Sequence, residues 1–181
     1  FSDGTDQEES NEETQEVQVT VSVSKDGKFL NDKDGNPMAG RSITLTGKNT
    51  YNMDDALKLA HDLYYPGGAE AGYDYHEDEN GIYDGIIYKL WGYNKNDVPN
   101  IKSILNHDTR NLGSALSRTV QNGDELHFFI QAQNGKDKFA FFTETEATYT
   151  QGQEITLKLR QRNDFGGCFS NCTGASIYIN G

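Results

Sequence analysis

The chain has 181 residues, which is enough for one domain with a sizeable hydrophobic core and terminal tails. Its 28 Asp and Glu against 16 Lys and Arg give a net charge of −12, which argues against nucleic-acid binding and against attraction to an anionic membrane surface. No apolar run approaches the roughly 20 residues of a membrane-spanning helix, so we expect no membrane insertion in this segment.

The N-terminal part predicts an acidic tail followed by paired strands. Residues 1–16 are poor in apolar side chains and rich in carboxylates, so they predict a disordered acidic linker. From Val17 to Val23, valines alternate strictly with polar residues, which is typical of a half-buried strand. A turn cluster over 31–37 and a second alternating segment over 41–46 predict that these strands form a hairpin or meander.

One well-marked helix follows. Asn52 is a suitable N-cap, and Asp55 three residues later suits a capping box. Pro66, Gly67 and Gly68 predict the end of this helix, and His61 is expected on its polar side. The apolar residues that recur at helical spacing, and so predict its buried face, are Met53, Ala56, Leu57, Ala60 and Tyr64.

The second half of the chain predicts mostly strands. Alternating or apolar segments bounded by turn residues cover 85–91, 125–130, 138–142, 154–160 and 174–181. Asn134 and Gly135 predict a hairpin turn between the second and third of these segments. Residues 100–105 predict a short helical turn. The expected fold class is α+β: a mostly antiparallel β-sheet domain over 17–160 with one principal helix.

The last residues, 161–181, are polar and rich in glycine until the final predicted strand. We expect them to form a linker and final strand or the start of a following module. Cys168 and Cys172 are the only cysteines, and they form either a local disulfide or a pair of free thiols.

Tyrosines gather in one segment of the sequence. Seven of the ten tyrosines lie between residues 64 and 93, where they alternate with glycines and carboxylates. This pattern predicts a long loop that serves as a binding surface, because Tyr and Trp offer apolar area with a polar tip. Alternatively, the rings cover the open face of a sheet. The candidate ligand-binding residues are Tyr64, Tyr65, Tyr73, Tyr75, Tyr83, Tyr88, Trp91 and Tyr93.

The histidines give no clear catalytic or metal-binding pattern. His76 precedes three acidic residues, which suit either a metal site or a solvated loop tip, and we favour the loop tip. His107 is expected in a loop, and His127 is expected on a strand, facing away from its neighbours toward the surface. The sequence contains no G-x-S-x-G, P-loop or H-E-x-x-H motif, so we expect no enzymatic activity and no metal site.

The order of these blocks resembles the transcobalamin-like C-terminal domain, a family also described as a domain of unknown function in bacterial surface proteins. The matching blocks are the YNMDDALKLA helix at 51–60, the segment 81–91 that ends in Trp91, and the NGDELHFFI strand at 122–130. The family's usual W-x-Y-x-x-N-G strand is not recognisable, and residues 100–118 stand in its place.

The resemblance implies a non-catalytic extracellular module of a bacterial surface or secreted protein, which binds a ligand or adheres through the tyrosine-rich segment. The expected partners are a small molecule, a glycan or other surface proteins, without a resident cofactor. One alternative is a carrier of a corrinoid such as cobalamin, and another is a structural spacer in a modular stalk. The expected location is extracellular or at the cell surface, with an export signal upstream of Phe1.

Overall fold

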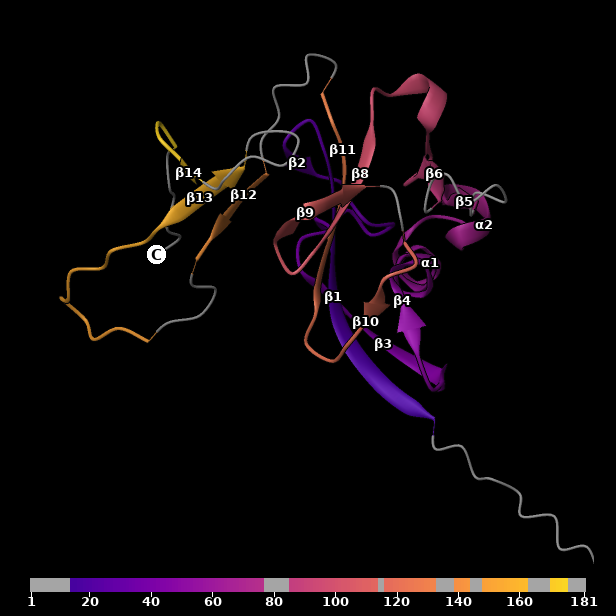
Figure 1. Cartoon of the computed structure of the whole chain (residues 1–181), viewed down its shortest axis with the longest axis horizontal. Coiled ribbons are helices and arrows are strands. Elements are labelled where there is room, and N and C mark those ends of the chain that lie inside the picture. Colours follow the sequence, from indigo (N-terminus) through magenta and orange to yellow (C-terminus); the bar gives the residue numbers. More distant parts are fainter. Residues whose placement is uncertain are drawn as a thin grey trace, which may run out of the picture.

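The computed structural model describes residues 14–76, 85–113, 116–132, 139–143, 148–162 and 170–175. Within these residues the chain is rich in strands that pair mostly antiparallel, and its principal helix is α1 (Met53–Tyr64). This arrangement confirms the predicted α+β class (Figure 1). No helix in the described part of the chain is both long and apolar enough to cross a membrane.

A six-stranded central sheet is the framework of the fold. Its strands are β1 (Gln15–Lys25), β2 (Lys28–Phe29), β3 (Arg41–Lys48), β8 (Ile101–Leu105), β9 (Asp108–Gly113) and β11 (Glu125–Ile130). They follow the order β2-β1-β11-β8-β9, with β3 pairing along β1 as well. The pairing of β1 with β11 is parallel, and the other pairings are antiparallel.

Strand β1 has the alternation that the sequence predicts, and its antiparallel pairing with β3 confirms the predicted hairpin or meander. The buried valines, each at most 2% exposed, are Val17, Val19, Val21 and Val23. Between the strands, the Asp32 carboxylate accepts hydrogen bonds from the backbone N–H groups of Asp34 at 2.9 Å and Asn36 at 2.8 Å. This side chain therefore stabilises the predicted turn.

Helix α1 begins with the capping box that the sequence predicts. The Asn52 side chain accepts from the Asp55 N–H at 2.9 Å, and the Asp55 carboxylate accepts from the Asn52 N–H at 3.1 Å. The helix ends at Tyr64, directly before Tyr65 and Pro66, and a short second helix, α2 (Gly68–Gly72), follows.

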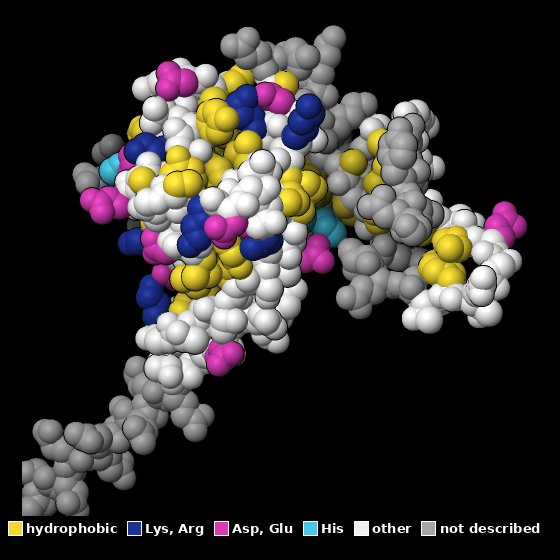
Figure 2. Space-filling view, turned by 180° about the vertical axis from the view of Figure 1, so that it is seen from behind, with side chains coloured by type: hydrophobic (Ala, Val, Ile, Leu, Met, Phe, Trp, Pro, Cys, Tyr) yellow, Lys and Arg dark blue, Asp and Glu magenta, His cyan; other side chains and the backbone are white. Residues whose placement is uncertain are grey.

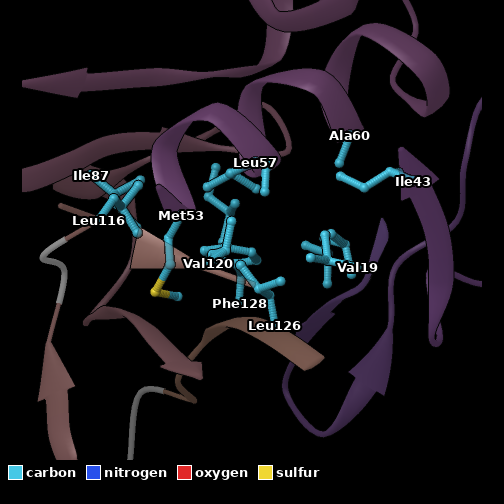
Figure 3. Packing of buried hydrophobic residues seen from close by; sticks show 14 of the residues in the cluster. Val19, Ile43, Met53, Leu57, Ala60, Ile87, Leu116, Val120, Leu126 and Phe128 are labelled. Carbon is cyan, nitrogen blue, oxygen red and sulfur yellow. The ribbon is translucent and has the colours of Figure 1, made fainter. Parts of the chain in front are cut away.

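The hydrophobic core lies between α1 and one face of the central sheet. Figure 3 shows Leu57 of α1 directed toward Val120 and Phe128, and Ile87 beside Leu116. Strand β11 contributes Leu126, Phe128 and Ile130 to this core, whereas the residues between them are only half-buried. One face of β11 therefore packs in the core, and its other face is partly exposed.

Three smaller sheets and one helical turn complete the described structure. The first sheet pairs β4 (Tyr51–Asn52) with β10 (Thr119–Val120), and the second contains β5 (Asp74–His76), β6 (Ile86–Leu90) and β7 (Tyr93–Asn94). The third contains β12 (Phe139–Phe142), β13 (Leu159–Arg162) and β14 (Ser170–Asn171). The helical turn is the 3-10 turn η1 (Lys95–Asp97), which follows β7. The β12–β14 sheet projects from the main body of the molecule (Figures 1 and 2).

Several local predictions were wrong. Residues 101–105 form strand β8 instead of a helical turn, because pairing with β11 outweighs an apolar spacing that also suits a helix. The predicted loop over 64–93 contains α2 and β5. The predicted strand over 154–160 begins only at Leu159.

Other predicted features lie partly outside the described residues. Strand β12 pairs with β13, and Asn134 and Gly135 of the predicted hairpin turn lie outside the described part. Residues 1–13 of the predicted linker and residues 176–181 of the predicted final strand also lie outside it. The predicted end of the linker was wrong, because Gln15 and Glu16 already belong to β1. Cys172 forms no disulfide with any described residue, and Cys168 lies outside the described part, so the disulfide and the pair of free thiols both stay predictions.

Candidate functional site

The predicted tyrosine surface is divided between the core and the solvent. Trp91 is buried, with 6% of its surface exposed, whereas Tyr88 and Tyr93 are 40% and 38% exposed. Tyr83 lies outside the described residues. The four half-buried members, which pack against the core, are Tyr64, Tyr65, Tyr73 and Tyr75. The structure therefore does not gather the described members into one exposed aromatic platform.

His61 lies at the centre of the buried part of this segment. Its ring centroid is 4.7 Å from that of Trp91, 5.1 Å from that of Tyr73 and 5.8 Å from that of Tyr65. Its Nδ1 lies 2.8 Å from the Leu57 carbonyl oxygen, and its Nε2 accepts a hydrogen bond from the Trp91 N–H at 3.1 Å. Nδ1 is therefore the donor, and the ring is neutral.

The prediction that His61 lies on the polar side of α1 was wrong, because its side chain is fully buried. The α1–α2 connection and the turn at Trp91 cover this side of the helix, which periodicity within α1 alone does not reveal. Burial lowers the pKa of His61 from 6.5 to about 4, against the opposing effects of the Leu57 carbonyl and the Asp62 carboxylate.

The alternation of tyrosine with glycine has a packing reason. A Cβ atom at Gly72 would lie 2.4 Å from the Tyr65 ring, and one at Gly92 would lie 2.3 Å from the Tyr65 hydroxyl oxygen. A Cβ at Gly85 would lie 2.1 Å from the hydroxyl oxygen of Tyr75. These glycines let tyrosine rings lie directly on the backbone, so the pattern stabilises the fold of this segment.

We expect Gly72→Ala to lower the free energy of unfolding by about 1–3 kcal/mol, because the Tyr65 ring is held between Gly72 and Gly92 and has little room to move. Urea unfolding followed by Trp91 fluorescence measures this change. The control is Glu70→Ala, an exposed position in the same short helix, which we expect to change stability by less than about 0.5 kcal/mol. Equal stability of the Gly72→Ala variant and the unmodified chain would contradict this packing.

A second feature, absent from the sequence predictions, is an apolar pocket between the outer face of the central sheet and strand β12. Its volume is about 500 Å³, within the range of small-molecule sites. We call it the phenylalanine pocket; its aromatic walls come from Phe29, Phe129, Phe139, Phe141 and Phe142. The half-buried face of β11 forms its floor.

Three polar side chains meet at the wall of the phenylalanine pocket. Glu125 Oε2 lies 3.0 Å from His107 Nε2 and 3.8 Å from His127 Nε2. Each of the three residues offers one ligand atom within 4.8 Å of the other two. Among the described residues, the buried Nε2 of His127 has no hydrogen-bond partner. Phe141 stacks on the His107 ring, with a centroid distance of 4.5 Å.

Local structure explains why these three residues meet. Glu125 and His127 are two residues apart on β11, so both side chains lie on its pocket face. His107 comes from the two-residue turn between β8 and β9, where Asn106 and His107 have φ values of 50° and 59°. Such positive values are typical of the tight turns that suit the twist of antiparallel strands.

Asn106 fastens this turn to the first residue of β11. Its N–H donates to the Glu125 carbonyl oxygen at 2.9 Å, and its side-chain oxygen accepts from the Glu125 N–H at 2.8 Å. Its amide nitrogen also donates to the Asp124 carboxylate at 2.6 Å. These bonds hold His107 beside Glu125.

Burial, and secondarily the nearby His107, lowers the pKa of His127 from 6.5 to about 4. At neutral pH its imidazole is therefore neutral, which is the form that binds metal ions. Two imidazoles and one carboxylate are a donor set found in zinc and non-haem iron sites.

The sequence pattern predicts the orientation of His127 but not that His107, Glu125 and His127 lie together. Alternation along β11 correctly predicted that His127 faces away from Leu126 and Phe128. The prediction of a surface position was wrong, because the phenylalanines of β12 lie over this face and leave the side chain 24% exposed. The pairing of β8 with β11, which brings His107 to Glu125, is not visible in either segment alone.

His76, the histidine that the sequence singled out, is exposed and lies 2.9 Å from the Asp74 carboxylate. Its acidic neighbours, 77–79, lie outside the described residues. On the face shown in Figure 2, acidic and basic side chains are interspersed with hydrophobic ones.

Comparisons of the chain with family models, curated proteins and solved structures gave no match. The resemblance to the transcobalamin-like C-terminal domain therefore stays a prediction. The features that bear on function are the fold and the cluster of two histidines and one glutamate beside the phenylalanine pocket.

Proposed function

We propose that the chain is a non-catalytic extracellular module of a bacterial surface or secreted protein, and that it binds an apolar small molecule in the phenylalanine pocket. The observation that carries the proposal is the pocket itself, a space of about 500 Å³ that aromatic rings line in large part. Ligand sites of small molecules are concave and mostly apolar, with a few polar groups that fix orientation.

The walls of the pocket favour a ligand with an apolar body and one polar end. Rings from β11 and β12 would contact the body, and Phe129 and Phe139 already lie nearly parallel with centroids 6.3 Å apart. The polar end would meet His107, Glu125 and His127 at one wall. The Ser22 and Ser24 positions of β1 border the same space.

A second candidate surface is the exposed pair Tyr88 and Tyr93, which suits the predicted glycan-binding or adhesive role. Both belong to the β5–β7 sheet, and both are more than a third exposed. The ammonium group of Lys95 lies 5.2 Å from the ring centroid of Tyr88, and that of Lys25 lies 5.3 Å from that of Tyr93. These cations already occupy one face of each ring.

The test is titration of the untagged chain with the apolar dye Nile red in the presence of EDTA, followed by dye fluorescence. We expect saturable binding of one dye per chain. Phe129→Ala removes a pocket wall and is expected to weaken binding about tenfold or more. Tyr93→Ala, on the other candidate surface, is the matched control and is expected to bind the dye unchanged.

Non-saturable binding, or binding that Tyr93→Ala weakens and Phe129→Ala does not, would overturn the assignment to the phenylalanine pocket. Competition by unlabelled compounds then defines the ligand class. Displacement of the dye by cobalamin would support the corrinoid-carrier alternative, and displacement by a glycan would contradict an apolar ligand.

A further inference from the structure

We propose that His107, Glu125 and His127 bind one divalent transition-metal ion, and that Zn²⁺ is the ion that suits these donors best. The inference deepens the proposed function because the ion would lie at the polar wall of the phenylalanine pocket. It requires only the three side chains, however, and not an organic ligand.

The spacing of the donor atoms is the first argument. With metal–ligand bonds of about 2.0–2.2 Å, the ligand atoms of a tetrahedral site stand roughly 3.3–3.6 Å apart. The distances from Glu125 Oε2 to the two histidine Nε2 atoms, 3.0 and 3.8 Å, lie on either side of this range. All three ligand atoms lie within 4.8 Å of one another, so side-chain movements of about an ångström would bring them to this spacing.

The second argument is that His127 Nε2 is otherwise unexplained. It is buried, it has no hydrogen-bond partner among the described residues, and its 3.8 Å distance to Glu125 is too long for a hydrogen bond. A buried polar atom without a partner costs about 1–3 kcal/mol, and a coordinated metal ion would remove this cost.

The third argument is that the backbone holds the donors in place before any ion binds. Two of them lie on one face of a central strand, and Asn106 fixes the turn that carries the third. Phe139 and Phe141 flank the two imidazoles and lower the local polarity, which strengthens the attraction between a cation and Glu125.

The donor set also selects the kind of ion. Two imidazole nitrogens favour Zn²⁺ and its first-row neighbours, whereas Ca²⁺ and Mg²⁺ prefer six or more oxygen ligands. Three protein ligands leave one tetrahedral position for water or for a donor atom of the pocket's ligand.

The test is isothermal titration calorimetry of the metal-free, untagged chain with ZnCl₂ at pH 7.5, in the absence of dye. We expect one Zn²⁺ per chain. Glu125→Gln and His127→Ala each remove a ligand, so affinity should fall by more than the roughly 10–100-fold that loss of an outer-shell partner costs. Asn106→Gly keeps the turn but removes its side-chain bonds to β11, and affinity should fall by about tenfold.

His76→Ala is the matched control, because His76 is an exposed histidine beside the Asp74 carboxylate; its affinity for Zn²⁺ should equal that of the unmodified chain. Glu125→Gln keeps the size of the side chain, so its result stands even if His127→Ala does not fold. A tetrahedral absorption spectrum with Co²⁺ provides a second readout.

No saturable Zn²⁺ binding by the unmodified chain, or unchanged affinity in Glu125→Gln, would overturn the metal site. Loss of Zn²⁺ binding in His76→Ala alone would overturn it too. Because the Nile red titration contains EDTA and the Zn²⁺ titration contains no dye, the metal site and the apolar site succeed or fail separately.

Discussion

Replacing Phe128 with alanine is expected to lower the free energy of unfolding by about 3–5 kcal/mol. Phe128 is fully buried in the core between the central sheet and α1, where it lies beside Leu57 and Val120 (Figure 3). Its removal leaves a cavity that the close-packed neighbours on α1 and the sheet fill poorly. Because a domain is stable by only about 5–15 kcal/mol, the loss is a large fraction of the total. Urea unfolding measured by circular dichroism checks this value.

The adjacent residue on the other face of β11 provides the control. Phe129 is half-buried and faces the phenylalanine pocket, so Phe129→Ala should cost clearly less stability than Phe128→Ala while it weakens dye binding. The two variants therefore separate the core face of β11 from its pocket face. Equal losses of stability in both would contradict the assignment of these faces.

Acidification is expected to destabilise the fold through His61. In the folded state its pKa is about 4, against 6.5 in the unfolded chain, so between these pH values the unfolded state binds the extra proton. The contribution of His61 is fully present above pH 6.5 and falls as the pH decreases toward 4. The difference between the two pKa values corresponds to about 3 kcal/mol. The Asp62 carboxylate on α1 moderates the effect, and the Tyr73 ring faces the imidazole from beyond α2.

The measurement is the unfolding free energy in urea at several pH values between 7 and 4.5, for the unmodified chain and for His61→Gln. The glutamine variant should be less stable at pH 7, because the packing against Trp91 is lost. Its stability should also depend less on pH, by up to about 1.4 kcal/mol per pH unit, since one titrating group is missing. Parallel pH profiles for the two proteins would show that His61 does not titrate in this way.

Much of the fold could be predicted because its signals are local. The valine alternation of β1, the Asn52 cap of α1 and the alternation of β11 each lie within a few residues, and the structure confirms them. Strand β8 was missed because its spacing of apolar residues suits a helix as well as a strand, and only the pairing with β11 decides between them.

The candidate site was less predictable because it depends on contacts between distant segments. Tyr65 and Trp91 drew attention in the sequence as possible ligand contacts, but in the fold both pack against His61, and Tyr65 also lies against Gly72 and Gly92. His107, by contrast, is unremarkable in its own turn and becomes a possible metal ligand only beside β11.

The parallel pairing of β1 with β11 also bears on how the protein folds during synthesis. The two strands are about a hundred residues apart in the chain, and β1 lies between β3 and β11 in the sheet. Until Ile130 has left the ribosome, β1 can pair with β3, but its other edge stays open. Such an edge pairs readily with other chains. Nascent chains of this protein should therefore need protection from aggregation until β11 has been synthesised and has paired with β1.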